Sequence, residues 1–543
     1  MANPTVKVAV LGSGLAGLTA AYLLTKVPQN DETQYEVHVF EKAPSLGMDA
    51  YSVSLSTGDE DFRVDVPMRS FQGGYYPRLL KLYKELGVSF KKSDFSYSFS
   101  FAAPTRAGCH TIVTNMIYNG SSGMRGVSLP SVLKAQYQQV KETVPRLALQ
   151  YSAIALFVLA TMQLLLNYVR LLVMAAPLFR SSQVPHMTFC QWARHTAPSG
   201  SLARFTSADS AWIEFLTSVV LPLFSAVCTA SEADIMQHPV EEILDYIWLT
   251  IFTHHYVVTN GVCDVVRRLS ASMEHVHVSS PISDIMPDPA NPRLISLQCI
   301  DARGTAHTYN GFSHIIFATQ ANHAAELLSC YLSNLPPDSP QSHFVRDQIQ
   351  CLQSFTYRPS IVINHTDESL LPEDPHDRRD LNLVCLSDTA RHTKSRDQNS
   401  EGSICVSPSY TMATHSLREP GSSRVVYQTT NPIVSPRKDS ILSIARMERA
   451  VLTLDAKKAL RDLYVPPSQS SRQKHQRAAL SSGTLGRLQG MPEEQRTWPQ
   501  NRRPPGIWFC GSYAYQGIPL LEGCVVSAAN VVEQGISAQQ AET

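Results

Sequence analysis

The spacing of apolar positions near the N-terminus predicts a strand, a tight turn, a helix and a second strand. Residues 6–11 (VKVAVL) are apolar and β-branched enough for a buried strand, and residues 15–24 then change to the leucine and alanine spacing of a helix. Residues 35–40 (YEVHVF) predict the second strand. This order of elements indicates an α/β domain that begins with a strand–turn–helix unit.

Later stretches predict further strands and helices. Residues 62–88 indicate a strand and a turn followed by a helix with an apolar face, and residues 261–285 indicate a helix followed by two strands. A buried strand is predicted at 314–321. The last motif, residues 506–534, predicts a strand, a loop and a helix that begins near Glu522. Because a helix start is electrically positive, this one suits a partly negative ring system.

The turn after the first strand has the sequence Gly12-Ser13-Gly14-Leu15-Ala16-Gly17, which matches the dinucleotide fingerprint G-x-G-x-x-G. Gly12 permits the tight turn, Gly14 lets a pyrophosphate approach the backbone, and Gly17 lets the helix lie close to the strand. Glu41 ends the second strand 24 residues after Gly17, close to the spacing of a carboxylate that binds ribose hydroxyls. An acid there disfavours a 2′-phosphate, so the turn predicts FAD or NAD rather than NADP. A glycine turn without a ligand is the less favoured alternative.

Composition is that of an ordinary globular enzyme. The 543 residues are 43% apolar, and 46 basic residues balance 46 acidic ones, so no nucleic-acid partner is expected. The 11 cysteines are scattered without a Cys-x-x-Cys motif or clustered Cys/His spacing, which predicts reduced thiols and no metal site. The first apolar run is the predicted cofactor strand itself, so we expect no signal peptide and a cytoplasmic location.

These motifs together resemble the flavin amine oxidase superfamily, which includes phytoene-type desaturases and protoporphyrinogen oxidases. The resemblance covers most of the chain. Within the superfamily, the chain is similar in detail to an uncharacterised group of predicted FAD/NAD-binding oxidoreductases. It is carried by the glycine turn, Glu41 with Gly47, Val64-Asp65, and the segments SPISDI (280–285), HIIFATQA (314–321), HTDESLLP (365–372) and WFCGSY (508–513). A further match is the YP-x-L…ELGV helix that starts at Tyr76.

The resemblance implies an α/β fold in which a discontinuous Rossmann-type FAD-binding domain is interleaved with an α+β, amine-oxidase-like substrate domain. The FAD-binding domain is expected at residues 1–90, 256–330 and 506–543, and the substrate domain at 91–255 and 331–465. Residues 466–505 are basic and polar, which favours a flexible solvated linker over a membrane-facing patch. Residues 389–403 predict another loop.

The resemblance also assigns cofactor-binding residues. The pyrophosphate is expected on the backbone of the glycine turn, the adenosine ribose on Glu41 with Lys42 beside it, and the adenine against the backbone of Ile282. Gly511 and Ser512 are expected near the ribityl chain and phosphates, with the helix start at Glu522, Gly523 and Cys524 beneath the flavin. The full set is Gly12, Gly14, Leu15, Ala16, Gly17, Glu41, Lys42, Arg69, Ile282, Gly511, Ser512, Glu522, Gly523 and Cys524.

Three departures from the superfamily pattern bear on function. Its usual paired glycine after the second strand is Gly47-Met48 here, and its D-x-GG turn is Asp65-Val66-Pro67-Met68, so both turns have less backbone freedom. Typical amine oxidases place an aromatic residue two positions before the glutamate of the last motif, where this chain has Leu520. An aliphatic side chain offers no cation–π attraction, which weakens the case for an amine substrate.

A long apolar segment, residues 147–179, contains Arg170 as its only formal charge. Residues 147–169 are long enough for a helix to cross a hydrocarbon core of roughly 30 Å. A single crossing would place the glycine turn and the last motif on opposite sides of a membrane, although both are expected to bind one FAD. The segment therefore predicts an interfacial helix, a hairpin whose arms flank Arg170, or a buried helix of the substrate domain, with membrane contact favoured over burial.

The favoured hypothesis is a membrane-associated FAD-dependent oxidoreductase that takes a hydride from an apolar, lipid-like substrate, with O₂ or a membrane electron carrier as reoxidant. The alternatives are a flavin-dependent amine oxidase and a catalytically inactive flavin-fold scaffold. No catalytic acid or base is identified, because the flavin itself accepts the hydride. Packing or surface roles are favoured for four residues near cofactor elements, which are His254, His255, His323 and Tyr513.

Overall fold

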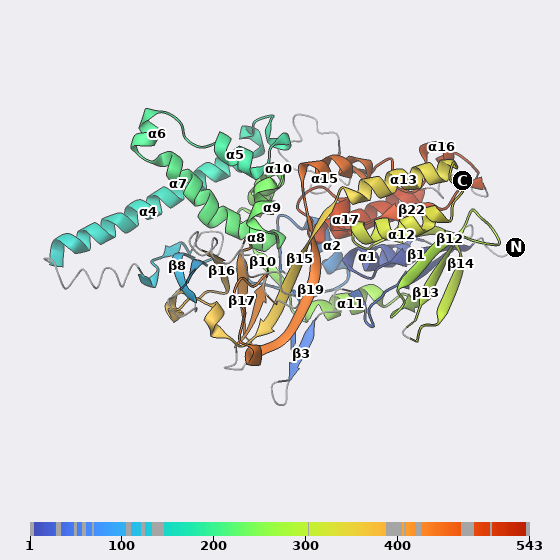
Figure 1. Ribbon diagram of the computed structural model, residues 1–543, viewed down its shortest axis with the longest axis horizontal. Helices are drawn as coiled ribbons and strands as arrows, with labels where there is room; N and C mark the ends of the chain where they lie inside the picture. The colour runs from blue at the N-terminus through green and yellow to red at the C-terminus, as the bar shows by residue number, and fades with distance from the viewer. Residues whose placement is uncertain are drawn as a thin grey trace.

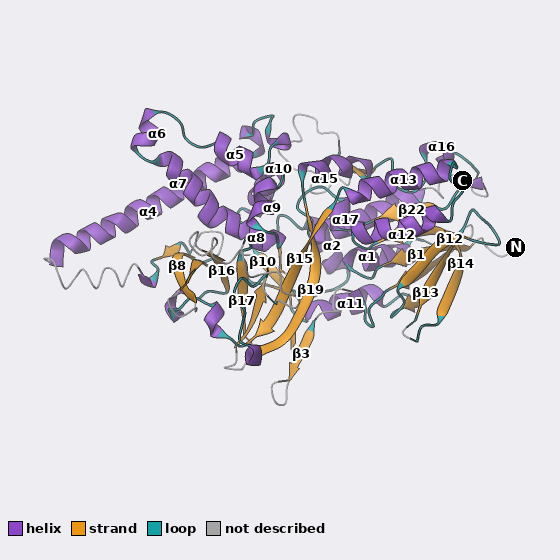
Figure 2. Ribbon diagram, in the orientation of Figure 1, coloured by secondary structure: helices purple, strands orange, loops and turns teal. Residues whose placement is uncertain are grey.

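The computed structural model shows an elongated molecule from which one helix projects (Figure 1). The structure describes residues 5–28, 34–47, 52–56, 61–67, 70–104, 110–120, 125–132, 146–301, 303–386, 404, 406, 409–418, 425–467, 483–499 and 502–538. A Rossmann-type sheet lies at the end that holds both termini, a second large sheet lies in the middle, and a group of helices lies at the other end (Figures 1 and 2). The sequence predictions at residues 389–403, Met48 and Arg69 fall outside the described residues.

A seven-stranded sheet forms the first part, in the order β11-β2-β1-β14-β13-β12, with β22 also paired to β14. Strand β1 is parallel to β2 and β14, β11 is parallel to β2, and β22 is parallel to β14, whereas β12 and β13 are antiparallel. The strands are β1 (Thr5–Leu11), β2 (Gln34–Phe40), β11 (His275–His277), β12 (Ile282–Pro287), β13 (Ile295–Ile300), β14 (Ala306–Phe317) and β22 (Gly506–Phe509).

Helices cover both faces of this sheet, because alternate side chains of β1 point to opposite sides. Val6, Val8 and Val10 pack towards one layer, while Ala9 and Leu11 pack towards the other. The first layer holds α1 (Leu15–Lys26), α17 (Leu521–Asn530) and the π-helix η12 (Val531–Ile536), and the second holds α12 (Ala321–Ser333) and α13 (Pro340–Gln353).

The central sheet has eight strands, in the order β19-β15-β18-β17-β16-β7-β8-β9. All its neighbours are antiparallel except β16 and β7. Its strands are β7 (Tyr97–Pro104), β8 (His110–Tyr118), β9 (Val127–Ser128), β15 (Thr356–His365), β16 (Leu381–Leu386), β17 (Met412–Arg418), β18 (Val425–Thr430) and β19 (Ile441–Val451).

Smaller elements join the two large sheets. A three-stranded sheet has the order β5-β10-β6, and two hairpin pairs complete the described strands. These elements are β3 (Val53–Ser56) with β4 (Asp61–Val64), β5 (Ser70–Gln72), β6 (Phe90–Lys92), β10 (His255–Val258), β20 (Tyr464–Val465) with β21 (Thr484–Leu485), and the helices α2 (Pro77–Glu85), α11 (Gly261–Ser270), α15 (Leu454–Ala459) and α16 (Glu493–Arg496).

The helical end of the molecule is built around the buried Trp192, Trp212 and Phe224. Thr188 begins one of its helices with a capping box, in which its side chain and that of Gln191 each accept a backbone N–H of the other residue. The helices are α4 (Arg146–Ala175), α5 (Phe189–His195), α6 (Ser201–Phe205), α7 (Ala208–Phe215), the π-helix η5 (Leu216–Val220), α8 (Leu221–Cys228), α9 (Glu232–Gln237) and α10 (Val240–Thr250).

The long apolar segment forms a single straight helix, α4, which extends away from the body (Figure 1). The hairpin alternative is wrong, because α4 runs unbroken through Arg170. The buried-helix alternative is also wrong for Val158–Ala175, since only 11% of that stretch is buried. A second stretch, Ala208–Cys228, is also long and apolar enough to cross a membrane, but 44% of it is buried in the helical core.

Part of the predicted flexible linker is folded. Residues 468–482 lie outside the described residues, but Leu488 and Met491 are buried. The side-chain amide of Gln489 donates to the carbonyl of Phe509 and accepts the N–H of the same residue, both at 2.9 Å. The expectation of a solvated linker is therefore wrong for residues 483–491, which pack beside β22.

Candidate functional site

The glycine turn has one position that the packing of the chain does not explain. Gly12 has a φ of +97°, and a Cβ on Gly17 would lie 1.9 Å from the carbonyl oxygen of Gly12. Both glycines are therefore required by the fold itself. Gly14 has an ordinary φ of −62°, and a Cβ there would meet no described atom within 4 Å. The space in front of Gly14, at the start of α1, is where the fingerprint predicts a pyrophosphate.

Two buried hydroxyl groups at the same sheet edge have no hydrogen-bond partner among the described residues. Thr319 follows β14, and its methyl group would lie 3.3 Å from a Cβ on Gly12. Its Oγ1 and the Oη of Tyr513 are both buried and unsatisfied. Both oxygen atoms are enclosed by the chain itself, so they do not line open space beside the glycine turn.

Glu41 lies at the end of β2, where the sequence places it, and its carboxylate faces the glycine turn. One oxygen accepts the N–H and the hydroxyl of Ser13 at 3.0 and 2.6 Å, and the other accepts the N–H of Ala43 at 2.9 Å. The oxygen that accepts the Ala43 N–H has a second lone pair, so a ribose hydroxyl can still donate to it. Lys42 is exposed.

The segment before Ile282 runs alongside Glu41. The backbone N–H of Ser280 donates to the carbonyl of Glu41, and that of Ser279 donates to the carbonyl of Ala43, both at 2.9 Å. Ile282 then begins β12 as a half-buried residue. The residues assigned to the adenosine end are therefore neighbours, although about 240 positions separate Glu41 from Ile282.

The C-terminal motif meets the glycine turn, as expected. Helix α17 packs against α1, and Gly511 follows β22 at the sheet edge that also holds the ends of β1 and β14. A Cβ on Gly523 would lie 2.9 Å from the carbonyl oxygen of Ser512, so only glycine allows this approach. The Ser527 hydroxyl accepts the N–H of Gly511 at 2.9 Å and lies 2.7 Å from the carbonyl of Gly523. Cys524 is half-buried against the cores around α1.

The Glu522 side chain has a role that the sequence did not indicate. Its two oxygens accept the backbone N–H groups of Arg78 and Leu79 at 2.9 and 3.0 Å. These are N–H groups that the start of α2 leaves without an intrahelical partner, so Glu522 caps that helix. Burial raises the pKa of the Glu522 carboxyl to about 7. The Glu522 carboxylate is therefore directed to α2, while the expectation that this helix start lies beneath a flavin stays a prediction.

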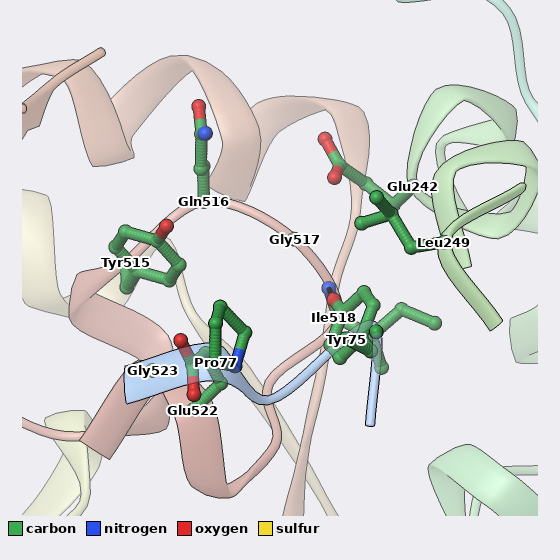
Figure 3. A pocket seen from close by; sticks show the side chains of 11 residues that line it. Tyr75, Pro77, Glu242, Leu249, Tyr515, Gln516, Gly517, Ile518, Glu522 and Gly523 are labelled. Carbon is green, nitrogen blue, oxygen red and sulfur yellow. Dashed lines mark hydrogen bonds between the residues drawn. The ribbon is translucent and has the colours of Figure 1, made fainter. Parts of the chain in front are cut away.

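A small open pocket lies where α17, the 515–518 loop, the start of α2 and α10 meet (Figure 3). Tyr515, Pro77 and Glu522 line one side, and Glu242 and Leu249 line the other (Figure 3). Its remaining lining residues are Gly74, Tyr75, Gln516, Gly517, Ile518 and Gly523. The Tyr75 hydroxyl accepts the N–H of Ile518 at 2.9 Å, and Gly517 has a φ of +102° beside it.

The pocket wall is more aromatic and more acidic than the sequence suggested. Leu520 stands where amine oxidases carry an aromatic residue, but Tyr75 and Tyr515 bring two rings to the pocket from other positions. Glu242 is buried and forms an ion pair with Lys457 at 2.9 Å. The sequence analysis did not identify Tyr75 or Glu242. The repeated glycine and tyrosine of QGGYYP (72–77) was the signal available for Tyr75.

The other residues singled out in the sequence lie outside this pocket's lining. His254 Nδ1 lies 2.8 Å from an oxygen of Asp94, and the side-chain amide of Gln72 donates to His255 Nε2 at 2.6 Å. Burial lowers the pKa of His255 to about 4, so its ring is neutral near pH 7. His323 is on the surface beside Glu326.

Comparison with known proteins identifies one part of the chain. The family model described as an NAD(P)-binding Rossmann-like domain matches residues 10–86. This segment is a Rossmann-like domain. The match covers the end of β1, the glycine turn, α1, β2 and α2, so the Rossmann-type α/β fold expected from the sequence is confirmed. A search of curated proteins found no match to the sequence.

Solved structures of putrescine oxidase are similar to the whole chain. The wild-type enzyme bound to putrescine gives a TM-score of 0.48 at 13% identity, covering 98% of this chain and 100% of that one. A double mutant and a single mutant, from a redesign of cofactor binding in that enzyme, give TM-scores of 0.47 and 0.46 with the same identity and coverage. At this identity and these scores, no substrate or mechanism transfers from putrescine oxidase to this chain.

Proposed function

We propose that the protein is an FAD-dependent oxidoreductase acting on an apolar substrate at a membrane surface. The space in front of Gly14 carries this proposal, because it is the one glycine position of the turn that internal packing leaves unexplained. The free N–H groups at the start of α1 face that space, and no acidic residue in the first turn opposes a phosphate. Glu41 at the ribose end favours a cofactor without a 2′-phosphate.

The chain's own residues would bind and orient both molecules. Bound flavin accepts a hydride, so the protein has to hold the donor C–H bond close to the ring and exclude water. The pocket beside Gly523 adjoins the start of α17, where the ring is expected, and its wall on α10 belongs to the helical end of the molecule. Substrate would therefore enter between the Rossmann-like domain and the helices that carry α4.

Helix α4 supports the membrane part of the proposal. Its polar side chains turn towards the body of the molecule and its apolar side chains turn outward, which is the reverse of a helix on a water-facing surface. The guanidinium of Arg170 lies over the Trp212 ring and donates to the carbonyl of Thr196 at 2.5 Å, and the side-chain amide of Asn167 donates to the carbonyl of Ala211 at 3.2 Å. The outward positions are mainly large apolar side chains, which are Val158, Leu159, Met162, Leu165, Leu166, Val169 and Val173. Only lipid or another apolar surface would cover such a face favourably.

Amine oxidation remains the second candidate, on one specific observation. Tyr75 and Tyr515 line the pocket, and the Glu242 carboxylate lies on the opposite wall. Aromatic faces and a carboxylate both attract an ammonium group. Lys457 opposes this reading only in part, because its single charge is shared between the carboxylates of Glu242 and Glu241.

The test is a reductive titration of the reconstituted protein. Purified protein incubated with FAD and passed through a desalting column should absorb near 450 nm. Under anaerobic conditions, a long-chain alcohol or alkene donor should bleach this band, whereas putrescine and benzylamine should not. Bleaching by the amines alone would replace the apolar-substrate proposal with amine oxidation. Failure to retain FAD would overturn the oxidoreductase proposal altogether and favour the inactive scaffold.

A further inference from the structure

Three histidines gather on one face of the Rossmann-like sheet, away from the cofactor edge. Strands β2 and β11 are parallel, and their register sets His275 opposite His38. The two rings stack with centroids 4.4 Å apart, and His277 stacks on Phe40 further along the strand. Glu36 lies two residues before His38 and therefore on the same face of β2. One ligand atom from each of Glu36, His38 and His275 lies within 4.8 Å of the others.

The hydrogen bonds around His38 resemble the support that metal-binding histidines need. Its Nε2 lies 2.8 Å from a Glu36 oxygen, and its Nδ1 lies 3.1 Å from His277 Nε2. A histidine that binds a metal through one nitrogen usually donates its other N–H to a fixed acceptor, which holds the ring in place. His277 provides that acceptor for His38.

The cluster has an aromatic inner side and an outer side that reaches solvent. Tyr309 and Phe312 pack edge-on against the His38 ring. Glu36 and Lys7 close the outer side of the cluster at half-exposed positions, with the Lys7 ammonium 3.1 Å from a Glu36 oxygen. Among the described residues, Lys7 is the cation that pairs with Glu36, and it would have to turn outward for a metal ion to bind.

We propose that Glu36, His38 and His275 form a site for a divalent transition-metal ion, with His277 as the positioning residue behind His38. Two imidazoles and a carboxylate are a ligand set typical of Zn²⁺, with water completing the coordination. The ion would join the short edge strand β11 to β2. Because Ser279 and Ser280 follow β11 and bind the backbone of Ala43 and Glu41, the ion would also brace the ribose end of the nucleotide site. This proposal does not depend on the flavin chemistry.

The test is Zn²⁺ binding by equilibrium dialysis and the visible spectrum of Co²⁺-loaded protein, both on tag-free protein. We expect one equivalent of Zn²⁺, a Co²⁺ band typical of four or five ligands, and a melting temperature raised by the metal. His275→Gln should abolish all three effects, while His277→Gln should weaken Zn²⁺ binding by about 10- to 100-fold. The matched control is His307→Gln, which removes a surface histidine on β14 of the same sheet whose Nε2 lies 3.0 Å from an Asp301 oxygen.

Two results would overturn the site. One is wild-type protein that takes up no Zn²⁺ or Co²⁺ beyond the level of His275→Gln. The other is a His307→Gln variant that loses binding as completely as His275→Gln does. The melting temperatures of the metal-free variants must match that of the metal-free wild type, and Glu36→Gln provides a second ligand variant if His275→Gln does not fold.

Discussion

The carboxylate of Glu522 accepts the backbone N–H of Leu79 at 3.0 Å, which joins the start of α17 to the start of α2 across 443 residues of chain. This contact fixes the last motif of the sequence against the Rossmann-like domain beside the candidate pocket. It also places an acidic group in a buried position, where water cannot stabilise its charge. Two N–H donors at a helix start offset part of that loss.

Stability should therefore depend on pH through Glu522. Its pKa is about 7 in the folded protein and 4.5 as its ordinary value, so the folded state binds more protons between these pH values. The free energy of unfolding should fall as pH rises from about 4.5 to 7, by about 2–3 kcal/mol from this group, and should be level above pH 7. Urea unfolding of wild type and Glu522→Gln across this range should differ by that slope. Glu85→Gln, on the exposed side of α2, is the control and should keep the wild-type slope.

Substitutions in the glycine turn should separate ligand binding from folding. Gly14→Val introduces a side chain into space that no described atom occupies, so it should lower stability by about 1 kcal/mol or less while abolishing FAD retention. Gly17→Val would press against the Gly12 carbonyl and should lose about 3 kcal/mol or more. Absorbance near 450 nm after desalting and thermal melting measure the two effects. FAD retained by Gly14→Val would contradict the proposed pyrophosphate position.

Charges on the outer face of α4 should release the protein from membranes without unfolding it. Leu165 and Leu166 are 59% and 66% exposed, whereas Leu171 on the same helix is 4% exposed. The double variant Leu165→Glu/Leu166→Glu should lose co-sedimentation with liposomes, because each acidic group resists burial in hydrocarbon by about 2.5–3.5 kcal/mol. Its melting temperature should stay near that of wild type. Leu171→Glu should instead lower the melting temperature strongly, and equal destabilisation by both variants would mean that the outer face is covered by protein.

The base of α4 is held by a buried ion pair that should matter for stability. Arg180 Nη1 lies 2.6 Å from an Asp245 oxygen on α10, and the same guanidinium donates to the carbonyl of Ala175 at the end of α4. Arg180→Met takes the guanidinium away from the buried carboxylate and should lower the free energy of unfolding by about 3–5 kcal/mol. Arg180→Met/Asp245→Leu should recover most of that loss, as measured by urea unfolding. No recovery in the double variant would show that the bond to Ala175, rather than the ion pair, holds the helix.

The sequence predicts the nucleotide half of the site well because its signals are local. Residues 6–17 and Glu41 lie on consecutive elements, and the roles of Gly12, Gly14 and Gly17 follow from the geometry of one turn. The structure forms the predicted strand, turn and helix and packs α17 against α1, while nucleotide binding by these residues stays a prediction.

Contacts between distant segments were not predictable in the same way. The partners of Glu522 and the position of Tyr75 in the pocket wall depend on how distant segments of the chain pack together. In the sequence, His38, His275 and His277 cannot be told from ordinary strand residues. They come together because β2 and β11 pair in parallel. Residues 483–499 were predicted as part of a linker because they are mostly polar. The two buried apolar side chains there, Leu488 and Met491, are too few to produce a periodic signal.

The apolar segment shows a different limit. A helix that is apolar on every side has no periodicity from which to infer a buried face. Only the directions of Asn167 and Arg170, which turn towards the body, separate the supported side of α4 from the outward side.

Because β22 pairs with β14, the parallel sheet cannot be completed until the end of the chain has been synthesised. The strand that completes the parallel sheet is made from residues 506–509, so a nascent chain leaves the ribosome with β1 and α1 long before their last neighbour exists. At about 5–20 residues per second, roughly 25–100 s separate the synthesis of β1 from that of β22. Once β14 has been made, one of its edges has no partner until β22 follows about 190 residues later, which takes roughly 10–40 s at the same rate.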